Sequence, residues 1–208
     1  MQTFTTVTGI AAPFLRANVD TDVIMPKQFL KGIVREDLAK GVFHDLRFDA
    51  AGAMRPEFVL NRPGYRDAAV LVVGPNFGCG SSREHAVWGL AQLGIRAILG
   101  TSFASIFSDN CARNGILLVR LAAAEIEHVA MLCVNFTSST LTVDLVSQVI
   151  VLADGTRMPF STDSRVREDL LSGRDAVGAT LLSSDEIEAF EAGHWAAAPW
   201  LRPRAVGR

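Results

Sequence analysis

The stretch that decides the fold is residues 68–119, AAVLVVGPNFGCGSSREHAVWGLAQLGIRAILGTSFASIFSDNCARNGILLV. It opens with a continuous, valine-rich apolar run, Ala68–Gly74, which is typical of a strand buried on both faces. Two shorter candidate strands follow, Arg96–Leu99 and Ile116–Val119. These runs predict three strands of one sheet.

Helical segments separate the predicted strands. One runs from about Arg83 to Leu93 and the other from Phe103 to Asn114, and each is followed by a glycine, the residue that most readily ends a helix. Strands and helices that alternate with short links predict right-handed crossovers and parallel strand pairing.

The C-terminal third has a different pattern, with strands that follow one another directly. Asp154-Gly155 is a hairpin turn signal between two of these strands. We therefore expect an α/β fold with a mixed sheet, in which the parallel core is joined by an antiparallel hairpin region. The elements predicted here are helices at 122–132, 164–171 and 184–192, and strands at 140–145, 149–152 and 157–160.

The first third, residues 1–66, shows little periodicity, and we assign no strand to it. Residues 18–31 are predicted to be a loop that runs into a short helix. Residues 35–67 are predicted to be a long irregular excursion, which Phe43, Phe48 and Phe58 would keep ordered. We expect one domain over residues 1–193 and a loosely held C-terminal tail over residues 194–208.

Composition excludes several classes of protein. The chain has 208 residues and a net charge of −2, with no basic run of the kind that binds nucleic acid. Its three cysteines and four histidines are scattered and include no C-x-x-C, which argues against a disulfide framework, an iron–sulfur cluster or a zinc site in this chain. Without a signal peptide or a long apolar run, we expect a cytoplasmic protein with no membrane contact.

The strongest functional signal is the run NFGCGSSREH at residues 76–85, between a predicted buried strand and a predicted helix. Glycines let a ligand approach the backbone, and the unpaired N–H groups of a helix start attract anions. Ser81, Ser82 and Arg83 add hydrogen-bond donors suited to a carboxylate or a phosphate. The alternative is a plain glycine-rich turn that Ser82 caps, with Arg83 and Glu84 solvated. The run fits neither a Walker loop nor the dinucleotide-binding fingerprint.

Two further arrangements have competing interpretations. In the run NVDTDVIMPK at residues 18–27, two carboxylates are too few for a metal site, and Asp22 either orients Lys27 toward a substrate or caps a helix. Cys79 is a possible nucleophile with His85 as its base. We favour a small residue packed in a tight loop, because His85 lies at least one helical turn away.

Taken together, these runs resemble the small subunits of bacterial 3-isopropylmalate dehydratases, relatives of the swivelling domain of aconitase. The resemblance rests on residues 20–27 (DTDVIMPK), 76–86 (NFGCGSSREHA) and 102–107 (SFASIF). It covers nearly the whole chain, and only the tail after about Gly193 looks individual.

The resemblance implies a swivelling β/β/α fold and a large-subunit partner that carries a 4Fe-4S cluster, so that this chain holds no cofactor. It implies the isomerisation of 2-isopropylmalate to 3-isopropylmalate through 2-isopropylmaleate, a step of leucine biosynthesis. Ser81 would be the base and Asp22 an active-site aspartate. Ser82, Arg83 and Lys27 would bind the carboxylates of the dicarboxylate substrate, while Cys79 takes no catalytic role.

Other functions remain open at this point. Residues 28–35, QFLKGIVR, lie where this superfamily varies with substrate, so a methylmalate or homoaconitate-type substrate is an alternative. A stand-alone module that binds phosphate or nucleotide at residues 76–83, and a thiol enzyme that uses Cys79, are the others. A neighbouring gene for a chain about twice as long, with a C-x-x-C run, would favour the subunit.

Overall fold

The computed structural model describes residues 1–30, 37–81, 83–134 and 139–202. The chain forms two compact units, Met1–Gly173 and Arg174–Arg208. The first unit therefore ends earlier than the domain limit that we expected at residue 193. That limit falls inside a helix, Ser184–Ala197, which has no buried residue and continues into the expected tail.

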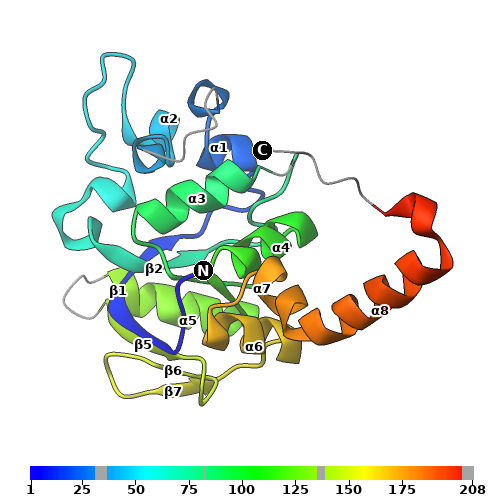
Figure 1. Cartoon of the computed structure of the whole chain (residues 1–208). Helices are drawn as coiled ribbons and strands as arrows, with labels where there is room; N and C mark the ends of the chain where they lie inside the picture. The colour runs from blue at the N-terminus through cyan, green and yellow to red at the C-terminus, as the bar shows by residue number, and fades with distance from the viewer. Residues whose placement is uncertain (31–36, 82, 135–138, 203–208) are drawn as a thin grey trace. The chain divides into compact units, whose positions relative to one another are not determined.

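The first unit is built on a seven-stranded sheet (Figure 1). The sheet is mixed, as the sequence predicted, and it contains the six predicted strands and one more, β1. The strand order is β4-β3-β2-β1-β5-β6-β7. Strands β1 to β4 pair in parallel, and β5, β6 and β7 extend the sheet from β1 by antiparallel pairing. The strands are β1 (Thr6–Phe14), β2 (Ala68–Val73), β3 (Ala97–Gly100), β4 (Leu117–Arg120), β5 (Thr140–Asp144), β6 (Val149–Val151) and β7 (Arg157–Pro159).

Strand β1 is the junction between the parallel and antiparallel halves, and the sequence analysis assigned no strand there. It reads TVTGIAAPF, in which a glycine, small residues and a proline replace the alternation typical of a half-buried strand. Pairing on both edges holds it instead, with Ala12 opposite Leu71 and Thr8 opposite Thr142. Tertiary pairing thus overrides a weak local pattern.

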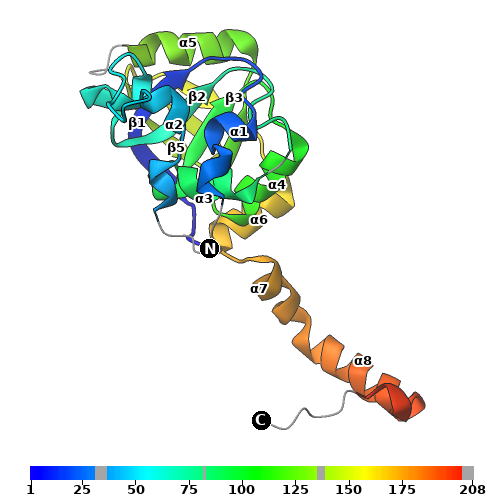
Figure 2. The same cartoon turned by 90° about the horizontal axis from the view of Figure 1, so that it is seen from above.

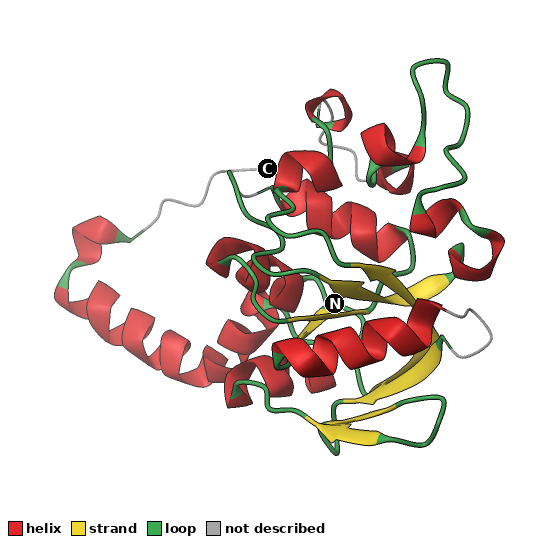
Figure 3. Cartoon of the chain, turned by 180° about the vertical axis from the view of Figure 1, so that it is seen from behind, coloured by secondary structure: helices red, strands yellow, loops and turns green. Residues whose placement is uncertain are grey.

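The predicted helices form close to their expected limits, and short helical turns fill the irregular first third (Figure 3). In the excursion, Phe43 and Phe58 are buried and both pack edge-on against Phe14, while Phe48 is partly exposed. The helix α7 in the second unit was not predicted. The helices are α1 (Thr21–Ile24), α2 (His44–Arg47), α3 (Glu84–Gln92), α4 (Ser105–Arg113), α5 (Ala123–Val134), α6 (Ser164–Ser172), α7 (Ala176–Thr180) and α8 (Ser184–Ala197), with 3₁₀ turns at Lys27–Phe29, Leu38–Lys40, Val59–Asn61, Pro63–Tyr65, Leu181–Ser183 and Pro199–Leu201.

The sheet is covered on both faces, with α3 and α4 on one side and α5 on the other (Figures 2 and 3). Packing on both faces explains why every residue of β2 is apolar. Leu71 and Val73 belong to the core cluster shared with α3 and α4, whereas Val70 and Val72 belong to the cluster shared with α5. Since successive side chains of a strand point to opposite faces, a strand between two helical layers needs apolar residues at every position.

In the part of the chain that the structure describes, none of the helices has both the length and the apolar character that a membrane span requires.

Candidate functional site

Two loops lie together where the parallel strands β1 and β2 end. Gly78 N donates a hydrogen bond to the Val19 carbonyl at 2.8 Å, and Thr21 N donates one to the Cys79 carbonyl at 2.9 Å. These bonds join the 18–27 run to the 76–85 run like a short extension of the sheet. The two segments that the sequence analysis singled out separately therefore form one site.

The first residues of the two runs are fixed by a pair of asparagines and by a third loop. Asn18 and Asn76 both have a positive φ, which asparagine tolerates better than most residues, and Asn76 Nδ2 donates to Asn18 Oδ1 at 2.8 Å. The backbone N–H of Asn76 donates to Ser102 Oγ at 2.9 Å, and Phe77 forms a bridge with Phe103. The SFASIF run thus supports the glycine-rich loop.

Gly78 is required by both conformation and space. Its φ is +76°, and a Cβ atom there would lie 2.2 Å from Cγ of the Phe107 ring. Phe107 in turn packs edge-on against Phe77, with ring centroids 5.6 Å apart. The loop therefore lies directly on the hydrophobic core, which holds its backbone in place.

The two aspartates of the first run have separate tasks. Asp20 caps α1, since its Oδ1 accepts a hydrogen bond from Val23 N at 2.7 Å. Asp22 lies in the first turn of α1 and faces the second loop, where Arg83 Nε donates to its Oδ1 at 2.9 Å. Its other oxygen is 3.9 Å from Lys27 Nζ. The helix-capping role considered for Asp22 is wrong, because Asp20 already fills it.

Arg83 connects this carboxylate to Ser81. Its Nη2 lies 3.5 Å from Ser81 Oγ, at the long limit of a hydrogen bond. The carbonyl of Ser81 accepts a hydrogen bond from the hydroxyl of Thr21 at 2.9 Å. Ser81, Asp22, Arg83 and Lys27 are thereby brought to one place, and Ser82 lies outside the described residues.

The cluster is open to solvent. The side chains of Arg83, Asp22 and Lys27 are 29%, 38% and 75% exposed. Ion pairs this exposed add little to stability, so their arrangement fits ligand binding better than a structural task. An arginine and a lysine held by one aspartate can bind a second, external carboxylate.

The structure does not place Cys79 and His85 as a catalytic pair. In the described ranges, the ring of His85 contacts Trp88, with centroids 4.7 Å apart, and no hydrogen bond joins it to Cys79. Cys79 is partly buried in the loop, as expected for a packed small residue.

The residues that hold the two loops of the site together are not evident from the sequence. Thr21 is 1% exposed and holds Ser81, although nothing in its local sequence distinguishes it from a loop threonine. Glu84 is not simply solvated either, because Asn114 Nδ2 donates to its carboxylate at 2.9 Å. Both are contacts between segments far apart in sequence, which a local pattern does not predict.

Metal ligands do not cluster in the described part of the chain. No group of three or more His, Cys, Asp or Glu side chains there lies close enough to hold a metal ion. The described side chains therefore do not fit an iron–sulfur cluster.

Two family models match parts of the chain. The sequence model of the aconitase C-terminal domain matches residues 1–124, and that of the C-terminal domain of the 3-isopropylmalate dehydratase small subunit matches residues 177–204. The second match extends past Gly193, so the expectation that the tail is individual to this chain is wrong.

Similar proteins extend over the whole chain. It is 53% identical over 202 residues to 3-isopropylmalate dehydratase small subunit 1 of Mannheimia succiniciproducens, covering 97% of this chain and 100% of that protein. It is 50% identical over 208 residues to small subunit 2 of Salmonella typhimurium, covering 100% of both. A crystal structure of 3-isopropylmalate dehydratase from Methanocaldococcus jannaschii matches with a TM-score of 0.63 and 26% identity, over 89% of this chain and 99% of that chain.

The glycine-rich loop, the charged cluster beside it and the full-length similarity lead to one assignment. The chain belongs to the family of 3-isopropylmalate dehydratase small subunits, whose larger part is an aconitase C-terminal domain.

Proposed function

We propose that this chain is the small subunit of a 3-isopropylmalate dehydratase that isomerises 2-isopropylmalate to 3-isopropylmalate in leucine biosynthesis. Water is lost to give 2-isopropylmaleate and is then added back with the hydroxyl on the neighbouring carbon. The observation that carries the proposal is the Asp22–Arg83–Ser81 cluster, in which Ser81 and Arg83 belong to the glycine-rich loop and Asp22 to α1. It combines a carboxylate binder with a hydroxyl group in one open site.

Arg83 is proposed to bind a carboxylate of the substrate. A guanidinium carries five N–H donors, and the contacts to Asp22 and Ser81 use two of them. Asp22 fixes the guanidinium in place through Nε. Lys27, whose ammonium is 3.9 Å from Asp22, supplies a second positive charge for the same dianion. Ser82 is proposed as a further carboxylate contact from its position in the loop.

Ser81 is proposed as the base that removes the proton next to a substrate carboxylate. A serine hydroxyl is a weak acid, so its alkoxide needs nearby positive charge. Arg83 Nη2 at 3.5 Å and the start of α3 at Glu84, three residues further along the chain, are proposed to supply that charge. In the return step, Ser81 gives the proton to the carbon that lost the hydroxyl. The hydroxyl is then added to the carbon that lost the proton.

The reaction also needs help for the departing hydroxyl, and this is proposed to come from the large-subunit partner. Its 4Fe-4S cluster would act as a Lewis acid on that oxygen. This chain's part is to bind the carboxylates, orient them and move the proton at Ser81. Its free cysteines fit the reducing cytoplasm, which we propose as its compartment.

The experiment is co-expression with a 3-isopropylmalate dehydratase large subunit, followed by an assay of the unsaturated intermediate by absorbance. The proposal expects turnover of isopropylmalate only when both chains are present. Faster turnover of methylmalate or homoaconitate in the same assay would instead assign the chain to a related hydro-lyase. Turnover by this chain alone, reconstituted anaerobically with iron and sulfide, would overturn the subunit assignment.

A further inference from the structure

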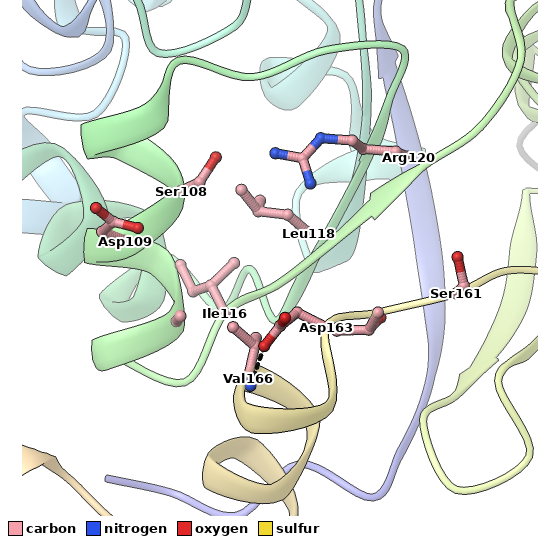
Figure 4. A pocket seen from close by; sticks show the side chains of 10 residues that line it. Ser108, Asp109, Ile116, Leu118, Arg120, Ser161, Asp163 and Val166 are labelled. Atoms are coloured by element: carbon pink, nitrogen blue, oxygen red, sulfur yellow. Dashed lines mark hydrogen bonds between the residues drawn. The ribbon is translucent and has the colours of Figure 1, made fainter.

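A separate cavity of about 590 Å³ lies beside the edge strand β4 (Figure 4). Its walls come from α4, β4 and the segment that leads into α6. Asp22, Lys27, Ser81 and Arg83 do not line it. Small-molecule sites in proteins usually have volumes of about 300–1,000 Å³, so the cavity is large enough for a metabolite.

The cavity contains one cationic side chain, Arg120, at the end of β4. Figure 4 shows it extending into the cavity toward Ser108 on α4. Its guanidinium carbon is 5.8 Å from the centre of the Phe103 ring, a contact that supports the group from one side. The planar, forked donors of such an arginine suit a carboxylate.

Two carboxylates stand apart from this cation. Asp109 comes from α4, and Asp163 lies where α6 begins, with its Oδ1 accepting from Arg165 N at 3.0 Å and Val166 N at 3.2 Å. Within the described residues, neither aspartate forms an ion pair with Arg120 or with any other cation. Because the cation and the carboxylates share a cavity but form no ion pair with each other, the cavity is suited to a ligand that has both a positive and a negative group.

The remaining wall combines apolar side chains with an unsatisfied hydroxyl. Ile116, Leu118 and Val166 form the aliphatic part. The hydroxyl of Thr162 is buried and has no hydrogen-bond partner among the residues described. Because this oxygen has almost no accessible surface, a ligand in the cavity does not reach it, and the hydroxyl takes no part in the site.

We propose that this cavity binds a free amino acid with an aliphatic side chain. Its carboxylate pairs with Arg120, its ammonium with Asp163, and its side chain lies against Leu118 and Val166. A dianion such as phosphate or a dicarboxylate is disfavoured, because one cation and two carboxylates give the cavity a net negative charge. The site is independent of the proposed dehydratase reaction.

The first test is a titration of the full chain with L-leucine and L-valine, followed by calorimetry and backbone amide shifts. Two analogues each remove one charge: 4-methylpentanoate lacks the ammonium, and 3-methylbutylamine lacks the carboxylate. The proposal expects saturable binding of the amino acids, with shifts at residues 108–120 and 161–166, and at least tenfold weaker binding of both analogues. Equal binding of 4-methylpentanoate would reduce the site to a simple carboxylate site and overturn the proposal.

The second test uses variants of the cavity. Arg120→Gln and Asp163→Asn should each weaken amino-acid binding at least tenfold; asparagine at position 163 can still cap α6. Arg157→Gln, at an exposed arginine on β7, serves as the matched control and should bind normally. Unchanged melting temperatures would show that the variants fold. The proposal is overturned if no amino acid binds, or if both cavity variants bind as the control does.

Discussion

The hydroxyl of Thr21 donates a hydrogen bond to the carbonyl oxygen of Ser81 at 2.9 Å, across 60 residues of sequence. Thr21 also binds the Cys79 carbonyl through its backbone N–H, so one buried residue holds both sides of the glycine-rich loop. The position of the Ser81 hydroxyl relative to Arg83 depends on this contact. Thr21 is therefore a positioning residue, since it acts on the reacting groups only through Ser81.

Replacing Thr21 tests this role. Thr21→Val keeps the shape and removes the hydroxyl, so kcat of the assembled enzyme should fall roughly tenfold, equivalent to about 1.4 kcal/mol in the barrier. KM should change less, because Arg83 stays paired with Asp22. Thr21→Ser restores the hydroxyl and should recover most of kcat. Equal losses in both variants would show that packing, not the hydrogen bond, is what matters.

Ser81→Ala tests the base. Loss of a general base typically lowers the rate by about 10²–10⁴, and the effect should fall on kcat because the carboxylate binders remain. Cys79→Ser, a change in the same loop, is the control and should keep substantial activity. Both require steady-state kinetics on complexes of equal cluster content. If the Ser81→Ala enzyme had a normal kcat and a raised KM, Ser81 would not be the base, and the loop would only bind the substrate carboxylate.

Arg83→Lys separates charge from geometry. Lysine keeps the positive charge but loses the planar fork, so KM should rise while kcat falls. The variant should still bind the large subunit, because no core volume is removed. If KM stays unchanged, Arg83 does not bind the substrate carboxylate in the ground state.

Asp22→Asn removes the charge that holds Arg83 and Lys27. We expect a higher KM and a lower kcat, whereas the free energy of unfolding should change by less than about 1 kcal/mol because the ion pairs are exposed. Asp20→Asn is the matched control, since asparagine also caps helices well. Its kinetics should resemble those of the unchanged enzyme, and similar kinetic losses in the two variants would contradict the division of tasks between the aspartates.

Gly78→Ala should destabilise the first unit. A left-handed backbone costs a non-glycine residue about 1–2 kcal/mol, and overfilling a packed core costs about 1–3 kcal/mol more. Gly52 has a similar φ of +81° but nothing within 4 Å of the point where a Cβ would lie, so Gly52→Ala should show only the first cost. Denaturant unfolding of both variants measures the difference, and equal losses would show that Phe107 moves aside easily.

The three thiols should differ in reactivity. Burial raises the pKa of Cys111 well above its usual value and that of Cys133 to about 11, because a low-dielectric interior disfavours the thiolate. At pH 8 a thiol reagent should label Cys79 first and the other two only after unfolding. The unfolded chain loses the Cys111 and Cys133 protons at lower pH than the folded one, so stability should fall as the pH rises above about 9. Rapid labelling of all three in the folded protein would contradict this.

The sequence by itself determined the strands β2, β3 and β4 of the parallel core. Strand β2 and helix α3 could be predicted because their signals are local: an apolar run at every position, a glycine-rich turn and a glycine after the helix. The candidate residues of the site could likewise be named, since a glycine-rich loop before a helix start, with Ser81 and Arg83, has a definite anion-binding chemistry. The resemblance then supplied their roles.

Only the tertiary structure decided how these pieces meet. Strand β1 has a weak pattern of its own and forms because β2 and β5 pair with both of its edges. Asp20 and Asp22 look alike in sequence, and it is the distance to Val23 N and to Arg83 that makes one a helix cap and the other a partner of the site. Hydrogen bonds and ion pairs depend on atoms that folding brings together. The contact between Thr21 and Ser81, 60 residues apart, therefore forms only when the sheet has aligned the ends of β1 and β2.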